Sequence, residues 1–302
     1  MKRLALALCL SLALAGCGTQ EDPAAAAAPK AATVAPKPSG PVEQIETQLA
    51  ALRNNDLAAL MKASIPKDKL AEMRADYEQT RAEPITEEDR KQFDESIGKL
   101  LAEGGVDQMM TELEPKLAEM KPQLPMIVGM GVMMAQQGVQ QSTELSEAQK
   151  AQMGQMLTGL QTWAMQTDFA DPARLRRALE AMKDGLAQSG IQRIEDLNAR
   201  DFEQMLSQFG PVVGGVKGAL SAYDLDVNAM LASIKPTLIA MEGDLARLKI
   251  DYTMFGTPLS LETELTRKDG YWYSKEALSQ LERETAGEPA AESEPEDAAT
   301  SE

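Results

Sequence analysis

Histidine is absent from the chain of 302 residues, and cysteine occurs only at Cys9 and Cys17. Without histidine there is no Ser-His-Asp or Cys-His catalytic set, and no zinc site of the usual Cys/His kind. Carboxylates, lysine, tyrosine and serine remain, but their spacing matches no recognisable catalytic constellation. We therefore predict no catalytic residue, no metal site and no cofactor. A carboxylate-dependent enzyme stays open as an alternative.

Aromatic and basic residues are also scarce. Aromatics make up 4% of the sequence beside 18 methionines, so a core would consist mainly of Leu, Ala, Met and Ile, as helical packing favours. Lys and Arg number 30 against 47 Asp and Glu, which gives a net charge of −17. Such a surface repels phosphate backbones, and we therefore predict no nucleic-acid partner.

The N-terminal residues contain the most specific motif of the chain. Lys2 and Arg3 precede a run of mostly Leu and Ala over residues 4–14, and Leu14-Ala15-Gly16-Cys17 closes it. This is the layout of a secretory signal peptide, and its end resembles the lipobox of bacterial lipoproteins. The apolar run is shorter than the roughly 20 residues of a membrane-spanning helix, which disfavours a transmembrane anchor. An ordinary signal peptide is the remaining alternative.

The resemblance implies that residues 1–16 are removed and that Cys17 becomes an acylated N-terminus. Several acyl chains together give stable anchoring, so the implied partner is a membrane bound through lipid. Cys9 would leave with the signal peptide, and the mature body would hold no disulfide. Gly18 stands where an aspartate typically keeps such proteins at the inner membrane. The expected location is therefore the bacterial envelope, on the periplasmic face of the outer membrane.

Composition divides the rest of the chain into four segments. Repeated prolines predict an extended linker over residues 17–41. Residues 42–236 carry apolar positions at helical spacing, and residues 237–284 alternate as an antiparallel β-meander with a closing helix. Residues 285–302 are acidic and predicted to be disordered. The expected fold class is α+β, mostly α: a helical body with a small C-terminal antiparallel β-meander.

Capping residues and breakers locate the individual elements. Side chains suited to a helix N-cap precede apolar helical repeats at Asp56, Thr86, Ser146, Asp171 and Asp226. A helix over residues 200–209 is expected to end before Gly210. The spacing by four of Gly210, Gly214 and Gly218 indicates a loop or a close helix contact. After a helix that ends at Pro236, strands are expected at residues 237–242, 245–255, 259–267 and 271–275.

The two ends of the body are similar to parts of one known fold. Residues 42–66 read as two short helices around Asn54-Asn55-Asp56, and residues 242–273 read as a meander turning at Asp269-Gly270. Together they resemble the opening and the closing meander of the nuclear-transport-factor-like cone superfamily. The long segment between them implies a helical domain inserted into that fold. The superfamily includes enzymes and non-catalytic lipoproteins, so the resemblance leaves function open.

Four methionines share one face of a predicted helix. Met126, Met130, Met133 and Met134 fall at i, i+4, i+7 and i+8. Because methionine fills irregular cores, burial is the first expectation. The same pattern also forms adaptable apolar surfaces for a partner, and these four residues are the candidate contact surface. Thioethers also bind Cu(I), although no histidine or free thiol accompanies them here.

Two further clusters have alternative interpretations. Trp272 lies on the opposite sheet face from Tyr271 and Tyr273, and we expect burial against the helices rather than an exposed aromatic cleft. Glu87-Glu88-Asp89 lacks the alternating ligands and the glycine of a calcium loop. We therefore expect a solvated helix start there.

The sequence as a whole favours a non-catalytic envelope lipoprotein that acts as an interaction or scaffold module. Confinement to a membrane raises the effective concentration of a weak binder, so a tethered body could contact another envelope protein. A small-molecule-binding lipoprotein, with a pocket between the sheet and the helices, is the alternative.

Overall fold

The computed structural model describes residues 40–142 and 146–279. The predicted signal peptide (1–16), Cys17, almost all of the predicted linker and the predicted tail (285–302) lie outside these residues. The described chain is α+β and mostly α, with one four-stranded antiparallel sheet near its C-terminal end. The predicted fold class is therefore confirmed.

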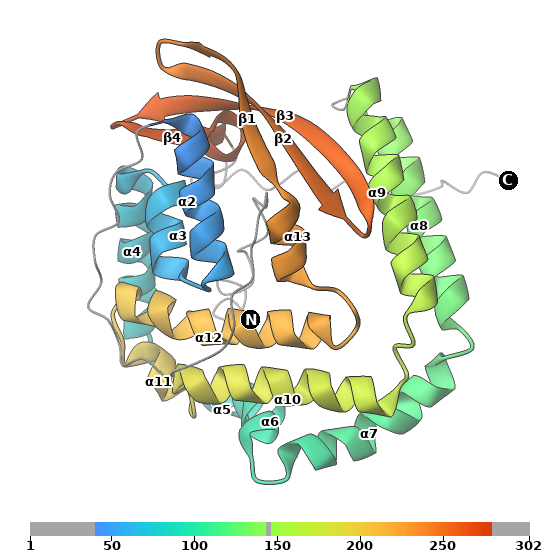
Figure 1. Ribbon diagram of the computed structural model, residues 1–302. Coiled ribbons are helices and arrows are strands. Elements are labelled where there is room, and N and C mark those ends of the chain that lie inside the picture. The colour runs from blue at the N-terminus through green and yellow to red at the C-terminus, as the bar shows by residue number, and fades with distance from the viewer. Residues whose placement is uncertain (1–39, 143–145, 280–302) are drawn as a thin grey trace, which may run out of the picture.

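The helices are labelled in Figure 1. Their bounds are α2 (Pro41–Arg53), α3 (Leu57–Ser64), α4 (Lys67–Ala82), α5 (Glu87–Phe93), the π-helical turn η1 (Asp94–Gly98), α6 (Lys99–Leu101), α7 (Gly105–Met120), α8 (Leu124–Gln141), α9 (Glu147–Gln166), α10 (Pro172–Ser189), α11 (Glu195–Asn198), α12 (Phe202–Ser221) and α13 (Val227–Ser233). The five predicted caps, Asp56, Thr86, Ser146, Asp171 and Asp226, each accept a backbone N–H in the first turn of their helix. Asp201 caps α12 in the same way.

Helices α10 and α12 form the closest helix pair and lie side by side across the molecule (Figure 1). Glycine makes this approach feasible: a Cβ on Gly185 would lie 2.5 Å from the carbonyl oxygen of Pro211, and one on Gly215 would lie 2.8 Å from that of Ala181. Of the three glycines spaced by four, Gly218 lies at this helix contact, where a Cβ would be 2.9 Å from the Cβ of Ala181. Gly210 instead approaches the turn after α2, where a Cβ would be 2.5 Å from the carbonyl oxygen of Asn55. The predicted helix end at residue 209 is wrong, because packing against α10 carries α12 on to Ser221.

The four strands follow one another in space as in sequence, in the order β1-β2-β3-β4. Their bounds are β1 (Lys235–Glu242), β2 (Leu245–Met254), β3 (Thr257–Lys268) and β4 (Tyr271–Ser274), and residues 275–279 are helical. The predicted meander is confirmed, except that Pro236 lies inside β1 instead of ending the preceding helix. Proline is tolerated there because β1 is an edge strand.

The sheet and the helical segment share a core. Ala246, Leu248, Leu265 and Trp272 form a buried cluster against which Val42 and Ile45 of α2 pack. Trp272 is therefore buried against a helix, as predicted. Tyr273 on the opposite face is buried as well, with the ring centre of Tyr271 6.5 Å from its own.

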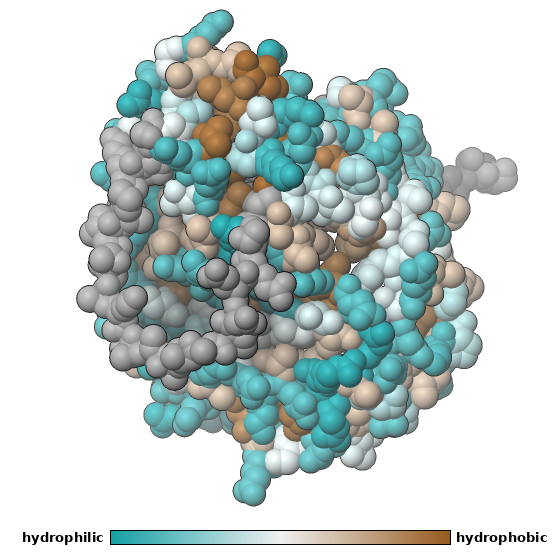
Figure 2. Space-filling model, in the orientation of Figure 1, coloured by the Kyte–Doolittle hydropathy of each residue, from teal (hydrophilic) through white to brown (hydrophobic). Residues whose placement is uncertain are grey.

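The sheet also has an exposed apolar edge. Leu238, Ile239, Met241 and Leu245 of the β1–β2 hairpin are exposed, and apolar colour covers this hairpin in Figure 2. A bulge between Leu238 and Ala240 interrupts the β1–β2 register. Such an irregularity hinders another strand from pairing with the free edge.

Helices α8 and α9 form a hairpin on the side of the molecule opposite α2, α3 and α4 (Figure 1). Within the described residues, no helix is long and apolar enough to cross a membrane.

Candidate interaction surface

The α8–α9 hairpin has a small core of its own. Val132 and Val139 of α8 pack with Leu157 of α9, and all three are buried. Local sequence explains both helix starts. A proline occupies the first turn of α8, and Ser146 caps α9 reciprocally with Gln149, whose side chain accepts from the Ser146 N–H at 2.8 Å.

The hairpin is almost free of charge, and we call α8 and α9 together the neutral arm. No Asp, Glu, Lys or Arg lies between Lys121 and Glu144, or between Lys150 and Asp168. An ion pair of 2.6 Å between Lys121 Nζ and Asp168 Oδ2 joins the chain just before α8 to the chain just after α9. The arm therefore differs from the rest of a chain whose net charge is −17.

The arm is held to the sheet at one glycine. A Cβ on Gly159 of α9 would lie 3.0 Å from the Cβ of Phe255 and 3.1 Å from the hydroxyl of Thr257. Phe255 and Gly256 form the β2–β3 turn with φ values of 50° and 74°. Positive φ is uncommon for a bulky residue, so this turn holds Phe255 in a strained conformation against the arm.

Aromatic rings complete the junction. The ring centre of Trp163 lies 5.7 Å from that of Phe255 and 5.5 Å from that of Phe169, which in turn lies 5.5 Å from Tyr223. The indole N–H of Trp163 donates to the carbonyl oxygen of Tyr223 at 2.9 Å. A satisfied indole donor and an edge-to-face contact between Trp163 and Phe169 make this junction specific as well as apolar.

The outer side of α8 is exposed. Met126, Met130, Met133 and Met134 have exposed fractions of 62%, 48%, 61% and 64%, and Ile127 between them is also exposed. We call these five residues the Met face. The expectation that the four methionines form part of the core is wrong. The valines on the other side of α8 meet α9, and no other described element makes an extensive contact with α8.

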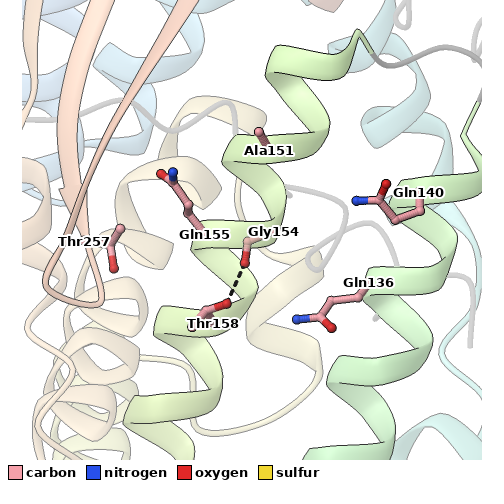
Figure 3. Close-up of a pocket in the computed structure, with 7 residues that line it drawn as sticks. All are labelled: Gln136, Gln140, Ala151, Gly154, Gln155, Thr158 and Thr257. Carbon is pink, nitrogen blue, oxygen red and sulfur yellow. Dashed lines mark hydrogen bonds between the residues drawn. The ribbon is translucent and has the colours of Figure 1, made fainter.

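A shallow groove of about 530 Å³ runs along the arm (Figure 3). Its lining side chains are uncharged: Gln136 and Gln140 of α8, Ala151, Gln155 and Thr158 of α9, and Thr257 at the start of β3. Gly154 contributes backbone only, and its carbonyl oxygen accepts from the Thr158 hydroxyl at 2.9 Å. The sequence predicted a pocket between sheet and helices for a small-molecule binder, and in this groove the sheet contributes Thr257 alone.

Ionisable side chains with shifted pKa values lie in the body. A hydrogen bond from Lys121 is the main reason that the pKa of Asp168 is lowered, and one from Lys268 lowers the pKa of Asp68 in the same way. Burial lowers the pKa of Lys217, whose ammonium donates to the Leu52 carbonyl oxygen at 2.5 Å, in the last turn of α2. An ammonium partner therefore favours the ionised form of both carboxyls.

The acidic run in the first turn of α5 has a structural explanation. Thr86 and Asp89 cap each other reciprocally, and Glu87 pairs with Arg90 at 2.9 Å. The predicted helix start at Glu87-Glu88-Asp89 is therefore confirmed. Within the described residues, no group of His, Cys, Asp and Glu could hold a metal ion.

The two predicted sites lie in different parts of the chain. Cys17 is outside the described residues, whereas the four methionines form one exposed face. Sequence reasoning missed the scarcity of charge on the arm and the junction between Gly159 and Phe255. The scarcity of charge could have been found in the sequence, because no charged residue lies between Lys121 and Glu144. No protein-family model, curated protein or solved structure matches the chain.

Proposed function

We propose that this protein is a lipid-anchored protein of the bacterial envelope that acts as a non-catalytic interaction module, with the Met face as its contact surface. The observation that carries the proposal is the exposure of five large apolar side chains on α8, a helix that contains no charged residue. Contiguous exposed apolar surface is unusual on an isolated protein and marks an interaction site.

The Met face suits protein contact better than small-molecule binding. Flexible thioether side chains adapt to an apolar partner surface, whereas a small-molecule site is concave and places a few polar groups around an apolar lining. The groove along the arm is shallow and wide open, and no charged side chain lines it. The lipid tether adds to a weak contact, because membrane confinement raises the effective concentration of both partners.

The test is a photo-crosslinking residue placed at Met133 in the full chain, in bacterial cells that produce it. We expect adducts from Met133 and none from a matched probe at Arg177, an exposed position on α10. Replacing Met126 and Met130 by Gln should weaken adduct formation from Met133 severalfold. An absence of adducts from Met133, or adducts of equal yield from Arg177, would contradict the proposed contact surface.

Stability has to be measured on the same variants. Because Met126 and Met130 are exposed, their change to Gln should leave the denaturant midpoint within experimental error. Val132→Gln in the same helix is the matched control for a core effect. This valine is 7% exposed, and an amide at its place should cost about 1–3 kcal/mol. A comparable loss of stability from the methionine changes would show that Met126 and Met130 are part of the core.

A further inference from the structure

We propose that the Met face binds the Met face of a second copy of this chain, with two α8 helices packed antiparallel around Met130. The inference names the partner of the surface in the proposed function and rests on that function. Its basis is the order of residues along α8. Residues 126–134 read Met-Ile-Val-Gly-Met-Gly-Val-Met-Met, which is a palindrome about Met130 except that Ile127 stands opposite Met133.

Exposure follows the same symmetry. Met126 and Met134 are exposed at equal distances from Met130, and so are Ile127 and Met133. Val128 and Val132, also equally spaced from Met130, belong to the core against α9. A Cβ on either Gly129 or Gly131 would meet nothing within 4 Å. By helical periodicity, Met130 is therefore the centre of the outer face and the valines form the inner one.

An antiparallel pair related by a two-fold axis uses this symmetry. The axis would pass beside Met130. A residue that follows Met130 in one copy then lies level with the residue that precedes Met130 by the same number of positions in the second copy. Met134 then lies level with Met126 of the second copy, and Met133 with Ile127 of the second copy. Between residues 126 and 134, the exposed side chains at each level of the contact are apolar in both copies. The result is a four-helix arrangement of two arms.

Charge selects the same surface. Two chains of net charge −17 repel each other over most orientations. The neutral arm presents a face that another acidic chain can approach without placing like charges in contact. The arm is also accessible to a second copy, because α9 is the one described element that covers α8 extensively.

Cysteine crosslinking in cells, on the full chain, tests the inference. Met130→Cys should form a covalent dimer about tenfold faster than Met165→Cys, an exposed control position on α9, because the contact raises the local concentration of the thiol. The unsubstituted chain, with Cys9 and Cys17, sets the background. Met126→Cys alone should crosslink slowly. Eight residues of helix separate it from its counterpart axially by about 12 Å, whereas disulfides need Cα atoms within about 7 Å.

The decisive result comes from cells that produce two variants together. Chains with Met126→Cys and chains with Met134→Cys should crosslink to each other rapidly, although each crosslinks slowly alone. If Met130→Cys crosslinks no faster than Met165→Cys, the second copy is not the partner. Photo-adducts from Met133 to a different protein or to lipid would then preserve the contact surface and reject self-association. An absence of any adduct from Met133 would reject the proposed function itself.

Discussion

At the scale of single residues, Gly159 allows the close contact between the arm and the sheet. Its missing side chain lets α9 approach the β2–β3 turn until a Cβ would lie 3.0 Å from the Cβ of Phe255. Phe255 has little freedom to move away, since its φ of 50° and the ring of Trp163 fix it from two sides. One small residue, one strained turn and one indole ring therefore hold the arm against the sheet.

Gly159→Leu should destabilise the fold by about 1–3 kcal/mol, because the added side chain overpacks the junction. Gly154→Leu on the same helix is the control. A Cβ there meets nothing within 4 Å, and leucine is a better helix former than glycine. Urea denaturation of both variants gives the comparison, with the fluorescence of Trp163 and Trp272 as the probe. Equal denaturation midpoints for the two variants would contradict the close packing of Gly159 against the β2–β3 turn.

Tyr273 gives stability a dependence on alkaline pH. Burial is the main reason that its pKa is raised from 10.0 to about 12. Unfolding exposes a phenol that ionises near pH 10, whereas the folded state keeps the proton until about pH 12. The contribution of Tyr273 is therefore fully present below about pH 10 and is lost as the pH rises towards about 12.

Tyr273→Phe removes the phenol and keeps the ring, so its stability should fall less over that pH window than that of the unsubstituted chain. Denaturant midpoints at several pH values between about 9 and 12 provide the test. Other tyrosines, such as Tyr252, also have pKa values raised by burial, and the difference between the two chains isolates Tyr273. Parallel loss of stability in both chains would argue against the assignment.

Within the elements, the β3–β4 hairpin depends on its turn. Asp269 and Gly270 both have positive φ, 53° and 76°, which is the backbone geometry of a tight two-residue hairpin turn. Lys268 pairs with Tyr271 across it, and Trp272 follows in the sheet core. The turn therefore fixes the register that places Trp272 against α2.

Gly270→Val should destabilise the fold by about 1–3 kcal/mol, because a β-branched residue strains at positive φ. Gly270→Asn is the matched variant, since asparagine tolerates the left-handed region, and it should lose much less. Chemical denaturation monitored by near-ultraviolet circular dichroism reports on the aromatic residues beside the turn. An unchanged midpoint for the valine variant would count against this geometry.

Local signals in the sequence predicted the elements better than their ends. Caps such as Asp171 and the turn at Asp269 act through their own neighbours, so their effect is readable from spacing alone. The extension of α12 past Gly210 was not predictable in this way, because contacts with α10 outweigh the helix-breaking tendency of Gly210 and Pro211.

The candidate site shows the same limit. Helical spacing places Met126, Met130, Met133 and Met134 on one face, and the structure agrees. Spacing does not indicate which side of an apolar helix meets the protein, because α8 is apolar on both sides. The position of α9 determines which side of α8 is buried. Leu157 of α9 packs against the valines and leaves the methionines exposed.

For the whole molecule, the acidic charge and the lipid anchor that we propose would act together. The net charge of −17 favours solubility and opposes close approach of other acidic surfaces, while the neutral arm is the place where approach costs least. The same charge opposes adsorption to anionic lipid headgroups, so membrane attachment in our proposal depends on the acyl chains at Cys17. The extended linker predicted over residues 17–41 would let the arm reach its partner at a distance from the bilayer.

The anchor can be tested on the full chain by metabolic labelling with a fatty-acid analogue. Cys17→Ser should abolish the label and move the protein from the membrane fraction to a soluble or unprocessed form, because the thiol that receives the first acyl group is missing. Cys9→Ser is the matched control. It removes the other cysteine of the chain but lies in the segment that the lipobox resemblance assigns to the signal peptide, so the label should persist. Label retained on the Cys17→Ser chain would refute the anchor. Loss of label in both variants would instead indicate that changes to the leader block export, and not that Cys17 carries the lipid.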